Sequence, residues 1–235
     1  VGDMAYNLQN WAGKKGDSYM NTIQTIARRI PYMVTAGNHE YYNNFSNFNM
    51  RFRFPNFKHT ENHYYSFELG NMHFVSWNMD LFLDYPHTKK AMLDWLAKDL
   101  KRANMNRKNQ PWIVAYTHRA LYCAQRVRDC RDSFTAQFNE FKQVLQFYKV
   151  DLVVSGHVHH YERMMPIREG KIGKFQRKPE DKEFREIINP QSPVFVMQGI
   201  AGVNGHNTDP KVLSPPKNWT VVQDNTFSYL AVKSS

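Results

Sequence analysis

Apolar and polar residues follow two different periods along this chain, and the change of period predicts its helices and strands. Apolar residues three and four positions apart, the spacing of one helical face, recur in three segments. Alternating residues and short apolar runs, which are typical of strands, lie between them. The predicted helices cover residues 17–30, 88–104 and 133–148. The predicted strands cover residues 32–35, 64–69, 72–77, 112–116, 151–154, 193–197 and 227–232.

Local signals mark the ends of several of these elements. Asp17 or Ser18 can cap the first helix, and Pro31 ends it because proline lacks the backbone N–H that a helix needs. Gly70-Asn71 separates two alternating segments and predicts a β-hairpin. Residues 171–189 are charged and aperiodic, which indicates a surface loop. Because strands alternate with helices and no domain boundary is evident, we predict one layered α/β domain over residues 1–235.

Polar side chains that can bind metal ions directly follow four of the apolar segments. Ligands at the carboxyl ends of strands converge on one edge of a sheet, where α/β proteins place their sites. The mixed oxygen and nitrogen donors suit iron, zinc or manganese rather than a metal that prefers thiolates. An aspartate among them can bridge two cations about 3.5–4 Å apart. These residues are Asp3, Asn38, His118 and His157, and His159 joins them because it shares the turn of Gly156 and His157.

The remaining histidines considered do not follow this pattern. None of them comes directly after a predicted strand together with a second candidate ligand, and a lone histidine most often has a structural role. We therefore expect no metal at these positions, which are His59, His63, His73, His87 and His206.

Composition and charge exclude several classes of protein. Hydrophobic residues make up 42% of the chain and aromatic residues 14%, enough for a packed core. No uninterrupted apolar run reaches about 18 residues, so we expect no membrane span. The net charge of +10 comes from basic residues scattered over predicted helices, which indicates solvated faces rather than a nucleic-acid surface. We expect neither nucleic acid nor membrane as a partner.

The two cysteines and two glycosylation sequons bear on the cellular compartment. Cys123 and Cys130 lie in a polar stretch, and the sequons begin at Asn44 and Asn218. Together they favour a secreted or lumenal glycoprotein with a small disulfide-closed loop, although two free thiols in a cytosolic protein remain the alternative. A disulfide here would stabilise the fold by roughly 2–3 kcal/mol through loop entropy.

Four motifs of the chain resemble those of the purple acid phosphatases, within the calcineurin-like metallophosphoesterase superfamily. The likeness covers nearly the whole chain and is nearest to the animal iron/zinc branch that is similar to the long plant-type enzymes. It implies a layered α/β/β/α metallophosphoesterase sandwich. The motifs are Gly2-Asp3-Met4-Ala5-Tyr6, Gly37-Asn38-His39-Glu40, Val114–His118 followed by Arg119 and Leu121-Tyr122-Cys123, and Gly156-His157-Val158-His159-His160-Tyr161-Glu162-Arg163.

The resemblance implies a dinuclear Fe(III)–M(II) centre. Asp3 would bridge the two metals, and Tyr6 would bind the ferric ion as a tyrosinate, which gives these enzymes their colour. His159 would bind the same iron. The implied activity is that of an acid phosphatase that hydrolyses small phosphate monoesters.

The same resemblance implies the second metal and the general acid. Asn38, His118 and His157 would hold a divalent zinc, iron or manganese ion. A metal-bound hydroxide would attack phosphorus, and two cations suit this reaction because they neutralise phosphoryl oxygens and lower the pKa of water. His39 would contact phosphate and protonate the leaving alcohol as general acid.

The chain departs from the family pattern in two places. The family carries a further metal-binding aspartate in an Asp-x-Gly motif upstream of Gly2-Asp3, and this sequence begins at Val1. We therefore expect a partial catalytic domain, incomplete at both ends, without the preceding strand or any fibronectin-like domain. Such a chain should bind its first metal poorly and be weakly active or inactive alone. In the second departure, Thr117-His118-Arg119-Ala120 stands where the family commonly has Gly-His-Arg-Pro.

Two other functions are compatible with these residues. A metallophosphodiesterase or nucleotide pyrophosphatase on the same scaffold would differ at the pocket rim, and a secreted non-catalytic binding protein would carry a degenerate site. Tyr6 separates the first alternative, because a tyrosinate–iron bond absorbs visible light. Candidates for the pocket rim, or for structural roles, are Arg119, Tyr122, Arg126, His160 and Glu162.

Overall fold

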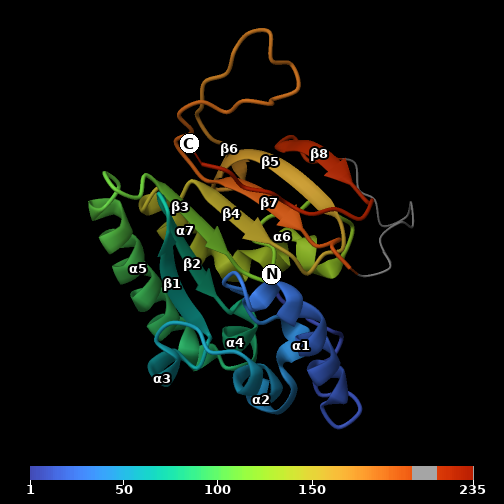
Figure 1. Cartoon of the computed structure of the whole chain (residues 1–235). Coiled ribbons are helices and arrows are strands. Elements are labelled where there is room, and N and C mark those ends of the chain that lie inside the picture. The colour runs from blue at the N-terminus through green and yellow to red at the C-terminus, as the bar shows by residue number, and fades with distance from the viewer. Residues whose placement is uncertain (203–215, 235) are drawn as a thin grey trace.

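A mixed β-sheet with helices against both of its faces forms the body of the molecule (Figure 1). The computed structural model describes residues 1–202 and 216–234. The strands run in the order β1-β2-β3-β4-β7-β5-β6, and β8 also pairs with β5. Strands β2, β3, β4 and β7 are parallel, whereas β1 and β5 run antiparallel to their neighbours. The strands are β1 (Tyr64–Leu69), β2 (Met72–Trp77), β3 (Trp112–Tyr116), β4 (Leu152–Ser155), β5 (Tyr161–Arg168), β6 (Lys171–Ile172), β7 (Val194–Gln198) and β8 (Thr220–Asp224).

Helices fill the connections between the strands. No helix among the described residues is long and apolar enough to cross a membrane. The α-helices are α1 (Lys14–Ala27), α2 (Tyr42–Arg51), α3 (Phe57–Thr60), α4 (Met79–Asp84), α5 (Lys89–Met105), α6 (Asp132–Thr135) and α7 (Asn139–Phe147). The short 3-10 turns are η1 (Asn38–Glu40), η2 (Pro86–Thr88), η3 (Arg128–Cys130) and η4 (Ala136–Phe138).

Two hydrophobic cores lie on opposite faces of the sheet. Successive strand residues point to opposite faces, so Ala115 of β3 belongs to one core and Tyr116 to the other. Helices α5 and α7 cover the first core, to which Leu96 contributes a fully buried side chain. Helices α1 and α2 lie against the second, where Phe48 is fully buried. This arrangement confirms the predicted layered α/β architecture.

Most predicted elements are present with shifts of a few residues. The predicted hairpin is β1–β2, with Leu69 opposite Met72 across the turn. The strand predicted at 112–116 is β3, and those at 151–154 and 193–197 are β4 and β7. The helices predicted at 17–30 and 88–104 are α1 and α5. The surface loop at 171–189 carries only β6 and a bridge between Gln176 and Ile188, and it extends away from the sheet (Figure 1).

The prediction of a strand at residues 32–35 is wrong. These residues are largely buried, but they pair with no strand in the described part of the chain. Side chains bind their backbone instead: the Tyr65 hydroxyl donates to the Val34 carbonyl at 2.7 Å. The Thr35 hydroxyl in turn donates to the Trp77 carbonyl at 3.4 Å. The segment still leads Asn38 into the η1 turn, as the prediction required.

Two further predictions also differ from the structure. The helix predicted at 133–148 is divided into α6, η4 and α7, because a tighter turn places Phe138 fully inside the core against Phe82. Residues 227–232 form no strand, and Tyr229 is 86% exposed. Strand β8 lies earlier, where it pairs with β5. Neither β5 nor β8 was predicted, since alternation alone does not show which segment finds a neighbouring strand.

His63 is a structural histidine, and we expect it to make stability depend on pH. Burial lowers the pKa of its ring to about 4. Between the usual value near 6.5 and about pH 4, the unfolded chain binds a proton that the folded protein excludes. The contribution of His63 is therefore complete above pH 6.5 and falls by roughly 3 kcal/mol toward pH 4. His63→Gln should flatten the dependence of the unfolding free energy on pH across this window, measured by urea denaturation.

The exposed His59 supplies the matched control. His59→Gln should keep the wild-type dependence of stability on pH. An unchanged slope in His63→Gln would contradict the assignment of this acid sensitivity to His63.

Candidate metal centre

All six predicted metal ligands lie together at one edge of the sheet. His118 follows β3 and His157 follows β4, and these two parallel strands end side by side. The hydrogen bonding between these two segments continues beyond the strands, because the Gly156 N–H donates to the His118 carbonyl at 2.9 Å. Asn38 comes from the η1 turn. The N-terminal segment adds Asp3 and Tyr6, and the loop before β5 adds His159.

His118 is the centre of the first group of ligands. Its Nε2 atom lies 3.0 Å from Asn38 Oδ1, 3.1 Å from Asp3 Oδ2 and 3.1 Å from His157 Nδ1. The side chain is only 1% exposed, so water cannot readily satisfy these atoms. Within the described residues, Asp3, His118 and His157 form a group whose ligand atoms all lie within 4.8 Å of one another.

The hydrogen-bonding capacity of this group fits a cation. His118 Nδ1 donates to the Val1 carbonyl at 2.8 Å, because a carbonyl can only accept. If the His118 ring is neutral, its Nε2 atom therefore carries a lone pair that faces other hydrogen-bond acceptors. If the ring is charged, Nε2 has a single hydrogen to share among several partners. A divalent cation accepts all of these lone pairs at once, and imidazole, amide and carboxylate donors suit such a metal.

Charges within the group favour the metal-binding states of Asp3 and His157, whereas burial of His118 is outweighed by the hydrogen bond and charge of Asp3, which raise its pKa. Burial opposes ionisation of Asp3, but the hydrogen bond and charge of His118 lower its pKa, so it is a carboxylate. Burial lowers the pKa of His157, aided by the charges of His118 and Arg119 and opposed by Asp129, so its ring is neutral. Deprotonated carboxylate and neutral imidazole are the metal-binding forms of these side chains.

Tyr6 and His159 form a second group on the other side of Asp3. The Tyr6 hydroxyl lies 2.9 Å from His159 Nε2 and 3.4 Å from Asp3 Oδ2. The same Asp3 oxygen therefore contacts both groups, which is where a bridging carboxylate would lie. Burial and the negative charge of Asp3 raise the pKa of Tyr6, so its phenol stays protonated unless a nearby cation stabilises the phenolate.

Backbone conformations that few residues adopt hold several of these side chains. Asp3, Tyr6 and His157 have φ angles of 56°, 39° and 68°, in the left-handed region. Close packing also requires glycine beside them: a Cβ on Gly37 would lie 2.4 Å from Asp3 Oδ1 and 2.8 Å from His118 Cε1. Such local strain persists where the surrounding structure over-determines it, often at functional sites.

Glu40 is a further residue of this centre that the sequence reasoning did not assign. Its carboxylate accepts the backbone N–H groups of Asp3 and Gly37 at 2.7 and 2.8 Å, and that of Met4 at 2.7 Å. Burial and the charge of Asp3 raise its pKa to about 7. Glu40 thus binds the two ligand-bearing segments to each other. The available signal was a charged residue three positions after Gly37, inside the Gly37-Asn38-His39-Glu40 motif itself.

His39 lies beside the second group, with its ring centre 4.1 Å from that of Tyr6. Its backbone N–H donates to Asp3 Oδ1 at 2.9 Å, and its Nδ1 atom contacts Asn7 Oδ1. If Nδ1 donates to this amide oxygen, Nε2 is left available to a ligand. A cavity of about 620 Å³ opens at the site and is lined by Asp3, Tyr6, His118, His157 and His159, among others, but not by His39.

The candidates for the pocket rim have different surroundings. His160 and Glu162 are fully buried and contact each other at 3.3 Å, so they are structural. Arg119 contacts His157 Nε2 at 2.8 Å and therefore belongs to the site. Tyr122 lines a separate cavity with Lys142, whereas Arg126 is exposed.

The other predictions on single residues have mixed outcomes. The disulfide between Cys123 and Cys130 is present, with 5.1 Å between their Cα atoms. His63 and His73 are buried and do not belong to the group of candidate metal ligands found among the described residues. His59 and His87 likewise take no part in a metal-binding group among the described residues, and His206 lies outside those residues.

The parallel strands and the candidate ligands after them define this chain as an α/β protein with a candidate metal centre at the carboxyl ends of its strands. The sequence profile of the calcineurin-like phosphoesterases matches residues 1–161. The chain belongs to this family.

Individual relatives show which members of the family this chain is similar to. The chain is 33% identical over 240 residues to human acid phosphatase type 7, covering 97% of this chain and 52% of that protein. It is 27% identical to purple acid phosphatase 18 of Arabidopsis thaliana, covering 97% of this chain and 48% of the relative. The chain thus spans about half the length of these relatives. The fold is that of the purple acid phosphatase from yellow lupin seeds, with a TM-score of 0.68 and 22% identity over 96% of this chain and 40% of the lupin chain.

Proposed function

We propose that the protein is an acid phosphatase that hydrolyses phosphate monoesters at a dinuclear Fe(III)–M(II) centre. The observation that carries the proposal is the position of Asp3, whose Oδ2 atom contacts both the His118 group and Tyr6. One carboxylate between two sets of donors is the arrangement that two neighbouring cations require. The similarity to acid phosphatases in animals and plants supports the choice of substrate class.

Each side chain has a separate role in this proposal. Asp3 bridges the two cation positions. Tyr6 and His159 hold the ferric ion, and Asn38, His118 and His157 hold a divalent zinc, iron or manganese ion. When bound, two such cations neutralise phosphoryl oxygens and lower the pKa of water, which supplies the nucleophile.

His39 is the proposed general acid. A general acid must lie within hydrogen-bond reach of the leaving oxygen, directly or through one water. The contact with Asn7 Oδ1 orients the ring so that Nε2 is the atom able to carry a proton to substrate. The adjacent Tyr6 ring, tilted by 40° to the His39 ring, restricts its rotation. Asn7 is therefore a positioning residue for His39.

We further propose a secreted or lumenal site of action. The disulfide supports this location, because such bonds persist in oxidising compartments. Both sequon asparagines, Asn44 and Asn218, are exposed and accessible to a glycosylating enzyme. A metallophosphodiesterase on the same scaffold is the alternative, and the side chain of Tyr6 distinguishes it from the proposed enzyme.

Tyr6→Phe tests the proposal without relying on turnover. The metal-loaded wild-type protein should show a visible charge-transfer absorption band, and Tyr6→Phe should lose it because phenylalanine offers no oxygen to iron. The control is Tyr19→Phe, which removes the hydroxyl of a nearby half-buried tyrosine that pairs with the Tyr32 hydroxyl at 2.7 Å. Absorption spectra are recorded for both variants. A separate assay compares turnover of p-nitrophenyl phosphate, a monoester, with that of bis(p-nitrophenyl) phosphate, a diester. A colourless wild-type protein that prefers the diester would contradict the proposed function in favour of the diesterase.

A further inference from the structure

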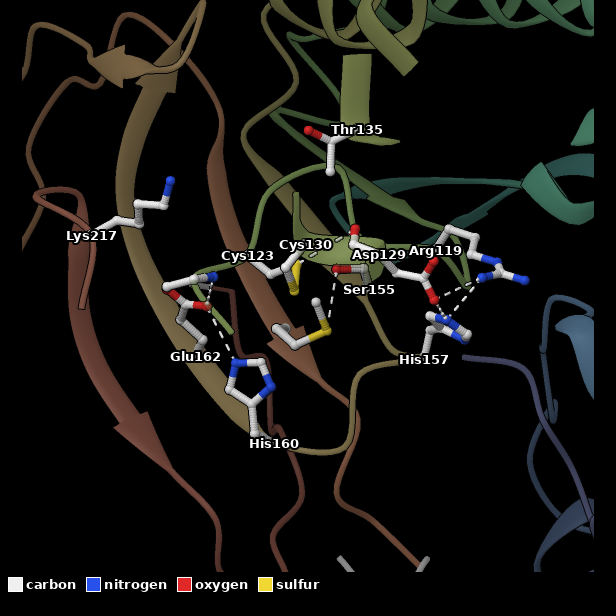
Figure 2. The surroundings of a disulfide bond; sticks show 12 residues. Arg119, Cys123, Asp129, Cys130, Thr135, Ser155, His157, His160, Glu162 and Lys217 are labelled. Atoms are coloured by element: carbon white, nitrogen blue, oxygen red, sulfur yellow. Dashed lines mark hydrogen bonds and ion pairs between the residues drawn. A yellow bond between two sulfur atoms is a disulfide. The ribbon is translucent and has the colours of Figure 1, made fainter. Parts of the chain in front are cut away.

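We propose that Asp129 is a positioning residue that sets the tautomer of His157, and that the Cys123–Cys130 disulfide holds Asp129 in place for this purpose. This inference rests on the proposed function, in which His157 binds the divalent ion. Figure 2 shows the three partners together, with Asp129, Arg119 and His157 in contact beside the disulfide. The loop that the disulfide closes would then control the affinity of the metal centre.

The contact with Asp129 leaves one nitrogen of His157 available to a metal. Asp129 Oδ2 lies 2.6 Å from His157 Nε2. Because a carboxylate can only accept, Nε2 carries the hydrogen of the neutral ring and Nδ1 keeps its lone pair. That lone pair lies 3.1 Å from His118 Nε2, inside the group of candidate ligands. A carboxylate on the second nitrogen is the usual outer partner of a metal-bound histidine.

Arg119 favours the opposite tautomer, which makes the carboxylate necessary. Its Nη1 atom lies 2.8 Å from the same His157 Nε2. A guanidinium can only donate, so alone it would place the ring hydrogen on Nδ1 and prevent metal binding there. Asp129 accepts from the imidazole and also lies 3.3 Å from Arg119. Asp80, whose side chain is 3% exposed, binds the guanidinium at 2.7 Å from the other side.

The disulfide determines where Asp129 can lie. Asp129 directly precedes Cys130, and both half-cystines are buried. Between them η3 covers Arg128 and Asp129, and the Cys130 N–H donates to the Val127 carbonyl at 3.1 Å, but residues 124–127 form neither helix nor strand. The disulfide supplies the missing constraint by joining the Asp129 end of the loop to Cys123.

The other end of the loop is attached to the element that follows the metal ligands. The Ala124 N–H donates to Glu162 Oε2 at 3.0 Å. Glu162 is fully buried on β5, which begins two residues after His159, and its other oxygen accepts the Thr220 hydroxyl at 2.7 Å. The Cys123 end of the loop is therefore fixed to the strand that follows His157 and His159.

Zinc affinity measures this role directly. Zn²⁺ binding to the metal-free protein would be followed by competition with a chromophoric chelator. Asp129→Ala should weaken the binding of one zinc ion by roughly 10- to 100-fold, the usual effect of removing an outer carboxylate partner. Asp132→Ala is the matched control, because this carboxylate lies three residues further on and is 86% exposed. Its zinc affinity should equal that of the wild type.

A double-mutant cycle tests the role of the disulfide. Removing it by Cys123→Ser with Cys130→Ser should also weaken zinc binding, since Asp129 is then less well held. In the Asp129→Ala background the same cysteine changes should have no further effect, because the carboxylate through which the loop acts is gone. Losses that multiply in the combined variant would overturn the proposed connection between disulfide and Asp129.

Asp129→Asn controls for a folding defect, because it keeps the shape of the side chain and lacks only its charge. It should melt like the metal-free wild type and still bind zinc more weakly. Wild-type affinity in both Asp129 variants would overturn the inference while leaving the proposed function intact. Failure of the wild-type protein itself to bind zinc would contradict the proposed function, and this inference with it.

Discussion

Asp3→Asn in the full-length protein is expected to lower kcat for phosphate monoesters by about 10³-fold or more. The carboxylate contacts both groups of ligands, so its loss removes the one atom that they share. Cations in such a site supply several kcal/mol of transition-state stabilisation, and about 4 kcal/mol corresponds to a factor near 10³. Asparagine keeps the shape of the side chain but lacks the charge needed to bridge two cations. Turnover of p-nitrophenyl phosphate and the metal content per chain should fall together.

Asp94→Asn on α5 makes the same chemical change at a carboxylate that is 54% exposed. It should leave both turnover and metal content unchanged, because its ion pair with Lys90 is on the surface. Wild-type turnover by Asp3→Asn would remove the basis for a bridged dinuclear centre, whereas absence of turnover in the wild-type protein itself would favour the non-catalytic binding protein.

His39→Ala is expected to affect substrates according to their leaving groups. An alkoxide needs a proton as it departs, and general acid catalysis contributes typically 10²- to 10⁴-fold. Hydrolysis of an alkyl phosphate should therefore slow by about 10²- to 10⁴-fold. p-Nitrophenolate departs readily without a proton, so hydrolysis of p-nitrophenyl phosphate should slow far less. Comparing kcat for a series of esters with leaving groups of increasing pKa would measure this difference.

Asn7→Ala should produce a weaker form of the same dependence, because it removes the contact that orients the His39 ring. The exposed His87 on η2 provides the control, and His87→Ala should match the wild type for every ester. An equal loss for all leaving groups in His39→Ala would argue that His39 binds phosphate and does not donate a proton.

Several features of the fold could be predicted because they depend on local sequence. The Gly70-Asn71 turn joins two alternating segments, so the β1–β2 hairpin has one favourable register. Helix α5 has a continuous apolar face and was predicted within one residue at each end. Residues 32–35 and 227–232 have similar apolar character, yet neither forms a strand. A strand needs a neighbour for its backbone hydrogen bonds, and a single segment does not show whether it has one.

Part of the candidate site could also be predicted from the sequence. Metal-binding residue types after successive strands indicate convergence because parallel strands end at the same edge of a sheet. This reasoning found Asp3, Asn38, His118 and His157, and the motif resemblance added Tyr6. It could not find Glu40, whose importance comes from three backbone N–H groups on two distant segments. Nor could it place His160 and Glu162 in the interior, because polar side chains are seldom fully buried.

The sequence by itself determined the family and the layered α/β architecture and supplied the candidate metal ligands, because each of these follows from residue type and local spacing. Only the tertiary structure decided which atom of each ligand faces its neighbours. Asp129 and Arg119 compete for the same nitrogen of His157 across 28 and 38 positions of sequence. The tautomer that leaves Nδ1 available to a metal therefore depends on folding, since contacts between distant segments set the position of that hydrogen.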